Sequence, residues 1–263
     1  MATETAPGET APRPSLWQSL AEGRALLELM AVAPAQPMLK LAARGDDHPV
    51  LVLPGFFAAD RSTASLRRYL ESRHFSVYAW EEGRNPGISD ALYQRLARRV
   101  RDLSDQHGST VSLVGWSLGG IYARLLAHRN AALIRQIVTL GSPFKMRQYG
   151  SINGAVTRLY QRFNPEQDRD PMLDYAELWA AAPPVPSSSI FSKGDGVAHW
   201  SFCVDDVEDE YTENIALPGS HLGMTHNPLY MYCVADRLAQ PEHGWRRFEW
   251  LPQLQQMLQR AVG

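Results

Sequence analysis

In the segment Thr110-Val-Ser-Leu-Val-Gly-Trp-Ser-Leu-Gly-Gly120, one serine, Ser117, stands between two glycines. The run before the first glycine contains Val111, Leu113 and Val114, and such β-branched and apolar residues are typical of a short buried strand. The residues after the second glycine, 121–128, are rich in helix formers and carry apolar side chains on one face. A Gly-x-Ser-x-Gly between a strand and a helix is the setting of a nucleophile elbow, a sharp turn that exposes the serine hydroxyl. The sequence therefore predicts that Ser117 is a nucleophile.

Segments with the character of strands alternate with segments of helical periodicity on both sides of this serine. The expected strands are 49–53, 74–80, 110–114, 134–140, 185–191 and 212–217. The expected helices include 62–73, 89–105, 121–128 and 229–238. Such alternation predicts an α/β fold with a mostly parallel central sheet that is covered by helices on both faces.

Length, charge and cysteine content restrict the class of protein. A chain of 263 residues is long enough for one well-buried α/β domain. The net charge of −2 and the pI near 6.4 give no basic footprint, so we expect no nucleic-acid partner. The two cysteines are too few for a disulfide framework, and we favour unpaired thiols over one bridge between Cys203 and Cys233. No apolar run reaches the ~18 residues of a membrane span, and the first residues lack a secretion signal, so we expect a cytoplasmic protein.

The chain before the first strand divides into two parts. Residues 1–14 are rich in Pro, Thr, Glu and Ala, and they are expected to form a disordered tail. Residues 15–47 are expected to form an N-terminal helical segment. The spacing of apolar residues over 15–32 predicts a helix with a broad apolar face. We favour packing of that face on the body of the domain, and a weak contact with a membrane surface is the alternative.

The main domain is expected over 48–263, and residues 145–184 interrupt its alternation. Helical spacing runs from Ile152 to Phe163, and a second apolar helix is expected from Met172 to Ala181. We interpret this stretch as a small helical cap. Gating of a pocket and simple covering of the sheet edge are two equally supported functions for it.

An acid and a histidine follow the last two expected strands. Asp195 lies on the turn Gly194-Asp-Gly196 after strand 185–191, at the edge where active sites of open α/β sheets gather. His221 lies on the loop after strand 212–217, and a histidine titrates near neutrality, as a general base must. Asp195 is then the carboxylate that orients the imidazole, and an ordinary turn aspartate is the competing interpretation.

Other acids and histidines fit these roles less well. The run around Asp205, Asp206 and Asp209 is interpreted as a solvated loop. His226 is the main rival of His221, but it precedes Asn227-Pro228 and is expected at the start of a helix.

The turn after the first strand supplies a candidate oxyanion hole. Gly55 lets the backbone approach a substrate, and the N–H of Phe56 then points at a developing oxyanion. Its partner is the N–H of Leu118, the residue after the nucleophile. An ordinary strand-to-helix turn is the alternative interpretation of Pro54-Gly55-Phe56.

Taken together and in order, these motifs resemble the α/β-hydrolase superfamily, most closely its bacterial esterase- and lipase-like members. The resemblance covers about residues 48–240 and rests on Leu53-Pro-Gly-Phe-Phe57, Gly115-Trp-Ser-Leu-Gly-Gly120, Gly194-Asp-Gly196 and Gly219-Ser-His-Leu-Gly223. It implies that Ser117 is the nucleophile, His221 the base and Asp195 the orienting acid. It also implies that Phe56 and Leu118 are the oxyanion donors. The chain departs from many lipases in having Pro54-Gly55 where they carry His-Gly, and it lacks the leading strands of larger members.

The resemblance implies a serine hydrolase that cleaves carboxylic esters through an acyl-enzyme intermediate. Its substrate is expected to be a small-molecule or lipid ester, and neither a metal nor an organic cofactor is expected. An acyltransferase or thioesterase with the same triad is one alternative, and a catalytically silent hydrolase fold retained for binding is another.

Overall fold

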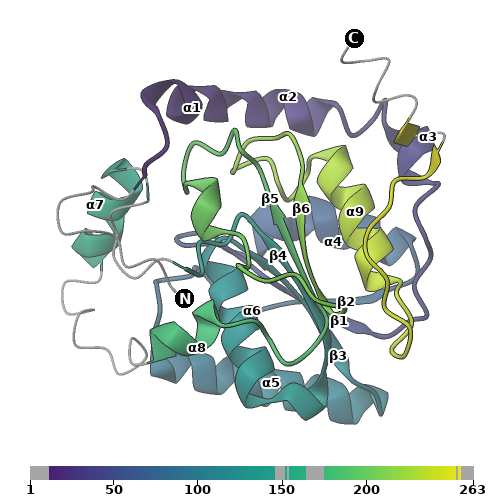
Figure 1. The fold of residues 1–263 in the computed structure, drawn as a ribbon. Helices are drawn as coiled ribbons and strands as arrows, with labels where there is room; N and C mark the ends of the chain where they lie inside the picture. Colours follow the sequence, from purple (N-terminus) through teal and green to yellow (C-terminus); the bar gives the residue numbers. More distant parts are fainter. Residues whose placement is uncertain (1–11, 146–151, 153, 164–174, 253, 256–263) are drawn as a thin grey trace.

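A computed structural model describes residues 12–145, 152, 154–163, 175–252 and 254–255. Within them, six strands form one sheet in the order β2-β1-β3-β4-β5-β6, and every pairing is parallel (Figure 1). The strands are β1 (Pro49–Leu53), β2 (Ser76–Ala79), β3 (Val111–Trp116), β4 (Ile134–Leu140), β5 (Ser187–Phe191) and β6 (Thr212–Ala216). Each coincides with a segment predicted as a strand, so the predicted α/β fold is confirmed.

Helices connect the strands at the predicted places. The main ones are α4 (Ala64–Ser72), α5 (Asp90–His107), α6 (Leu118–Arg129) and α9 (Pro228–Leu238). Ser89 caps α5, because its side chain accepts a hydrogen bond from the N–H of Leu92. In the part of the chain that the structure describes, no helix has the length and apolar character to cross a membrane.

Alternate residues of the strands pack on opposite faces of the sheet. In β1, Leu51 and Leu53 belong to the core cluster that includes α5 and α6. Val50 and Val52 belong to the cluster that includes α4 and α9. The period of two in the strands therefore gives the sheet two apolar faces, and each face is covered by helices, as predicted. Cys203 and Cys233 are both buried and unpaired.

The stretch predicted as a cap contains two described helices, α7 (Gly154–Phe163) and α8 (Ala176–Ala180). Residues 146–151, 153 and 164–174 lie outside the described residues, and so does the expected start of the second helix at Met172. The hydroxyl of Tyr160, on α7, accepts a hydrogen bond from the N–H of Ile88 at 3.2 Å. Trp179, on α8, is buried in the same cluster as α6. The gating function of this stretch stays a prediction.

The N-terminal segment differs from its prediction in two ways. Residues 1–11 of the expected tail lie outside the described residues. The expected single helix over 15–32 is three pieces, α1 (Leu16–Ala21), the 3-10 turn η1 (Glu22–Arg24) and α2 (Ala25–Met30), followed by α3 (Gln36–Leu39). The expected packing of its apolar face on the domain is wrong, since the side chains of that face are 46–83% exposed. They are Leu16, Trp17, Leu20, Leu26, Leu27, Leu29 and Met30.

The physical reason is that α1, η1 and α2 contact the domain through polar side chains. The segment runs across the top of the molecule in Figure 1, over loops that follow β5 and β6. Those loops present backbone N–H and C=O groups without strand partners, and polar side chains of the segment bind them. The apolar side chains therefore point to the opposite side.

A buried ion pair joins α6 to the loop after β5. The Arg124 guanidinium, with no exposed side-chain surface, lies 2.7 Å from the Asp205 carboxylate and stacks on the Phe144 ring at 3.6 Å. It also donates to the carbonyl oxygens of Trp179 and Ala181 at the end of α8. The interpretation of Asp205 as part of a solvated loop is therefore wrong. Asp205 turns inward because the buried Arg124 guanidinium attracts its carboxylate, while its neighbour Asp206 stays exposed.

Replacement of Asp205 by alanine is expected to lower the free energy of unfolding by about 3–5 kcal/mol, because it leaves the Arg124 charge buried without a partner. Asp206→Ala is the matched control. It removes an exposed pair with Lys145 and is expected to cost less than about 1 kcal/mol. Urea unfolding followed by tryptophan fluorescence measures both. Equal losses in the two variants would contradict the importance of the buried pair.

Candidate active site

The structure brings two of the predicted site residues, Asp195 and His221, into direct contact. The ring Nδ1 of His221 lies 2.6 Å from Oδ2 of Asp195, and each residue is 2% exposed. The other carboxylate oxygen of Asp195 accepts hydrogen bonds from the N–H groups of Val197 and Ala198, both at 2.8 Å. The turn after β5 therefore fixes the carboxylate, and the carboxylate fixes the imidazole.

The charges around His221 outweigh the effect of its burial. Burial lowers the pKa of His221, but the Asp195 carboxylate raises it by charge and by its hydrogen bond, and the Glu22 carboxylate adds to this. The net result is a pKa above the ordinary value. Since Nδ1 faces a carboxylate, the neutral ring carries its proton there, and Nε2 is left as the acceptor.

Ser117 occupies the sharp strand-to-helix turn that its motif requires. It joins β3 to α6 with φ 54° and ψ −120°, a positive φ that non-glycine residues rarely adopt. Its N–H donates to the carbonyl of Leu140 at 2.8 Å. The turn depends on close backbone packing, because a Cβ on Gly119 would lie 2.2 Å from the carbonyl oxygen of Leu53. The serine itself is half-buried.

Contacts beside Ser117 connect it with the acid and the base. The indole N–H of Trp116 donates to the carbonyl of His221 at 3.1 Å, and the two rings lie 5.8 Å apart. A Cβ on Gly141, after β4, would lie 3.1 Å from the Asp195 carboxylate. Among the described residues, no hydrogen bond joins the Ser117 hydroxyl to His221. Catalytic hydrogen bonds are often long without substrate, and all three side chains lie at the carboxyl edge of the sheet.

The predicted oxyanion donors flank the point where the strand order reverses. The chain leaves β1 toward β2 and returns to β3, and ligands of open α/β sheets bind at such a switch point. Gly55 follows β1, and a Cβ there would lie 3.1 Å from the Cβ of Ser117. Leu118 is the first residue of α6, so its N–H has no acceptor within the helix. Phe56 comes directly after Gly55, and its ring lies 4.7 Å from the Tyr160 ring.

The rival histidine is engaged elsewhere. His226 lies one residue before Asn227, the N-cap of α9, and its Nε2 lies 2.9 Å from the carbonyl oxygen of Ala25 in the N-terminal segment.

A second Ser-His-Asp set, which sequence reasoning missed, lies at the amino end of the sheet. Nε2 of His48 lies 2.8 Å from the Ser112 hydroxyl, and its Nδ1 contacts the Asp46 carboxylate. Ser112 has no exposed surface, so a substrate cannot reach its hydroxyl. Burial and the position at the amino edge mark this set as structural.

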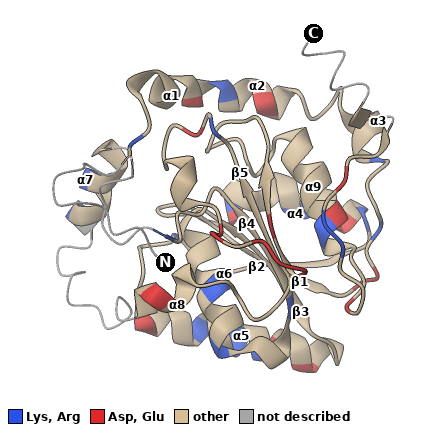
Figure 2. Cartoon of the chain, viewed as in Figure 1, with Lys and Arg blue, Asp and Glu red and all other residues tan. Residues whose placement is uncertain are grey.

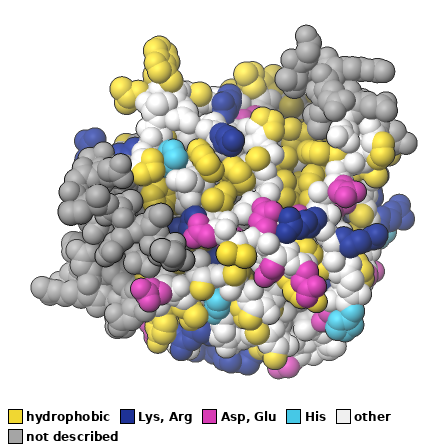
Figure 3. Space-filling view, in the orientation of Figure 1, with side chains coloured by type: hydrophobic (Ala, Val, Ile, Leu, Met, Phe, Trp, Pro, Cys, Tyr) yellow, Lys and Arg dark blue, Asp and Glu magenta, His cyan; other side chains and the backbone are white. Residues whose placement is uncertain are grey.

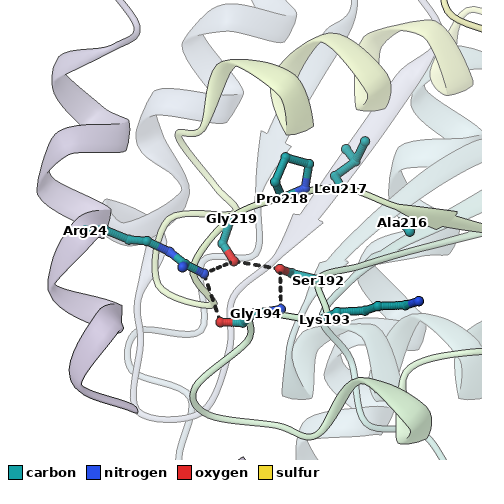
Figure 4. Close-up of a pocket in the computed structure, with 8 residues that line it drawn as sticks. All are labelled: Arg24, Ser192, Lys193, Gly194, Ala216, Leu217, Pro218 and Gly219. Carbon is teal, nitrogen blue, oxygen red and sulfur yellow. Dashed lines mark hydrogen bonds between the residues drawn. The ribbon is translucent and has the colours of Figure 1, made fainter. Parts of the chain in front are cut away.

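Sequence reasoning also missed the charged residues of the N-terminal segment. Glu22 is buried against the Asp195 and His221 loops, and Arg24 donates to the carbonyls of Gly194 and Gly219 at 2.9 and 2.6 Å (Figure 4). Their only sequence signal is their presence in an otherwise apolar helical stretch. Arg24 lines a pocket of about 320 Å³ with residues of both loops. Ser117, Asp195 and His221 do not line this pocket.

Comparisons with known proteins concern the family and the fold of the chain. No curated protein sequence matches the chain. Solved structures with similar folds include lipase B of Aspergillus fumigatus (17% identity, TM-score 0.56), which covers 74% of this chain and of which 53% is covered. A metagenome-derived lipolytic enzyme is 15% identical with a TM-score of 0.57, and the match covers 75% of this chain and 94% of the enzyme. A monoacylglycerol lipase of Paleococcus ferrophilus is 12% identical with a TM-score of 0.53, and the match covers 75% of this chain and 96% of the lipase.

These likenesses concern the fold, and this chain spans about half the length of the Aspergillus lipase. The sequence profile described as "Alpha/beta hydrolase family" matches residues 10–262, nearly the whole chain. The chain belongs to the alpha/beta hydrolase family.

Proposed function

We propose that this chain is a serine hydrolase that cleaves carboxylic esters, with Ser117 as nucleophile, His221 as general base and Asp195 as the orienting acid. The observation that carries the proposal is the buried 2.6 Å contact between Asp195 and His221, at the sheet edge that also holds Ser117. Membership of a hydrolase family and the similar lipase folds support a hydrolytic reaction.

The proposed reaction has two acyl-transfer steps. Nε2 of His221 takes the proton of the Ser117 hydroxyl while Oγ attacks the ester carbonyl carbon, and the imidazolium then gives this proton to the departing alcohol. Water that His221 deprotonates then attacks the carbonyl carbon of the acyl-enzyme. The bond from this carbon to Oγ breaks, the imidazolium returns the proton to Oγ, and the carboxylic acid is released. The Asp195 carboxylate stabilises the imidazolium in both steps, which fits the raised pKa of His221.

The backbone donors complete the proposed mechanism. The tetrahedral intermediate of each step carries a negative charge on the former carbonyl oxygen. The N–H groups of Phe56 and Leu118, on either side of the switch point, are proposed to bind this oxygen. Each such donor is worth roughly 10²–10³-fold in rate.

Hydrolysis of p-nitrophenyl esters from acetate to palmitate tests the proposal. We expect the wild type to be active and Ser117→Ala to lose about 10⁴- to 10⁶-fold in kcat, because no other group supplies the nucleophile. Ser112→Ala, in the buried Ser-His-Asp set, is the matched control and should keep its activity. Chain-length preference then separates an esterase for small esters from a lipase.

The same assay distinguishes the alternatives. Diversion of the acyl group to an added alcohol or thiol, at the expense of the free acid, would indicate an acyltransferase. A folded wild type that turns over no ester of the series would count against ester hydrolysis and favour the silent binding protein.

We further propose that the N-terminal segment makes a weak contact with an anionic lipid surface. Its exposed apolar side chains lie on the upper part of the face seen in Figure 3. Between residues 12 and 45, the exposed charged residues are Arg13, Lys40 and Arg44, and the exposed acids Asp46 and Asp47 follow directly. Charges of both signs lie along the segment as well as on the rest of the chain (Figure 2). Apolar and basic side chains together are what an anionic lipid surface attracts.

Co-sedimentation with anionic vesicles measures this contact. Leu27→Asp should lower the bound fraction about tenfold, since an inserted leucine contributes about 1.5–3 kcal/mol. Val207→Asp is the matched control, because Val207 and Leu27 are both 67% exposed and Val207 lies outside the segment. Equal binding of the two variants would contradict the contact.

A further inference from the structure

One carboxylate of the N-terminal segment contacts both the acid loop and the base loop. Oε1 of Glu22 accepts hydrogen bonds from the N–H of Gly196 at 2.8 Å and the N–H of His221 at 2.9 Å. Oε2 accepts from the N–H of Leu222 at 2.9 Å. Glu22 is 7% exposed. A carboxylate can only accept hydrogen bonds, and here three backbone N–H groups point at its two oxygens. The two loops therefore form a specific binding site for this side chain.

The glycines of the two loops provide an independent observation. A Cβ on Gly196 would lie 2.2 Å from the carbonyl oxygen of Gln18. A Cβ on Gly223 would lie 1.6 Å from the Glu28 carboxylate, and one on Gly194 would lie 2.8 Å from the Arg24 guanidinium. The loops therefore carry glycine where the N-terminal segment approaches them, so the sequence of the loops is fitted to the segment.

Further hydrogen bonds join the N-terminal segment to the two loops. Arg24 bridges the carbonyls of Gly194 and Gly219, one in each loop. Glu28 accepts from the N–H of Ser220 at 2.8 Å. The loops also contact each other directly, through the hydroxyl of Ser192 and the carbonyl of Gly219. Of the side chains of the segment, Glu22 is the one that binds His221 itself.

We propose that Glu22 is a positioning residue: its carboxylate ties the Asp195 loop to the His221 loop and so holds the imidazole against the acid in the geometry that catalysis needs. The inference rests on the proposed function of the pair. Glu22 does not touch a substrate. It acts through the position and the pKa of His221. Its hydrogen bonds to the N–H groups of Gly196, His221 and Leu222 hold the two loops, and its negative charge favours the imidazolium.

The charged and titratable groups around His221 make the sign of the charge effect clear. Asp195 faces the ring from the turn after β5, and Glu22 of η1 binds the backbone N–H of His221, while Glu28 and Arg24 lie against the neighbouring Ser220 and Gly219. Tyr230 of α9 and Cys203 also lie within the influence of Asp195, and burial raises the pKa of both, so they are neutral. Removal of the Glu22 charge lowers the pKa of His221, because the imidazolium loses a stabilising neighbour.

Glu22→Gln is the first variant to make. Its amide oxygen can still accept two of the three hydrogen bonds, but its NH₂ group faces an N–H and the charge is gone. We expect kcat for the best p-nitrophenyl ester to fall about 10- to 100-fold with little change in KM, since misplacement of a catalytic group affects the chemical step. The acid limb of kcat/KM should move to lower pH, because His221 stays neutral further down the scale.

A matched control and a second variant separate positioning from general support. Gln18→Ala removes a side chain of the same segment that binds only the carbonyl of Lys193 and caps α1. It should leave kcat and the pH profile unchanged. Glu22→Asp keeps the charge but is one methylene shorter, so it should lower kcat with a smaller change in the pH profile. Glu22→Asp also replaces Glu22→Gln as the test variant if Glu22→Gln does not fold.

The titration of His221, followed by NMR of its ring ¹³Cε1 in wild type and Glu22→Gln, requires no turnover. A downward shift of the pKa supports the inference even if the wild type hydrolyses no ester, in which case only the proposed function fails. An unchanged titration with unchanged kcat would overturn the inference. An equal fall of kcat in Gln18→Ala would overturn it too, because the segment would then act as a whole.

Discussion

Burial of the Asp195–His221 pair is the constraint on which the rest of the structure depends. Two hydrogen-bonded groups at 2% exposure receive little help from water, so the protein must satisfy the second oxygen of the carboxylate. The N–H groups of Val197 and Ala198 bind the free oxygen of the acid. The loops that carry acid and base are in turn held by side chains that are far away in the sequence.

Much of this site follows from rules that act locally. Period-two patterns identify the strands, the order of strand and turn places Asp195 and His221 at one edge, and Gly-x-Ser-x-Gly marks Ser117. The strands and the placement of Asp195 and His221 at one edge agree with the structure, because the carboxyl ends of parallel strands meet there whatever the surrounding loops do. The role of Ser117 stays a prediction. The turn at Ser117 is equally local, since the packing of Gly119 on β1 requires only the sheet and the helix behind it.

What the sequence did not reveal depends on partners that are distant in the chain. The apolar stripe of 15–32 predicts a packed helix, but Glu22, Arg24 and Glu28 are the side chains that face the domain. Asp205 reads as one more acid of a solvated run until Arg124 is placed beside it. His48 and Ser112 form a hydrogen-bonded set in the structure, and the complete burial of Ser112 and its place at the amino edge of the sheet exclude them from chemistry. The periodicity of a sequence indicates which residues share one face of a helix. It does not indicate whether that face packs on the domain or lies in solvent.

The contact between Glu22 and His221 joins residues that are 199 positions apart. Contacts of such high sequence separation form late, because the chain between them must be ordered first. During synthesis the N-terminal segment leaves the ribosome early, but its contact with His221 cannot form until the loop after β6 has emerged. A nascent chain that ends before this loop therefore carries Ser117 without the contact between Asp195 and His221.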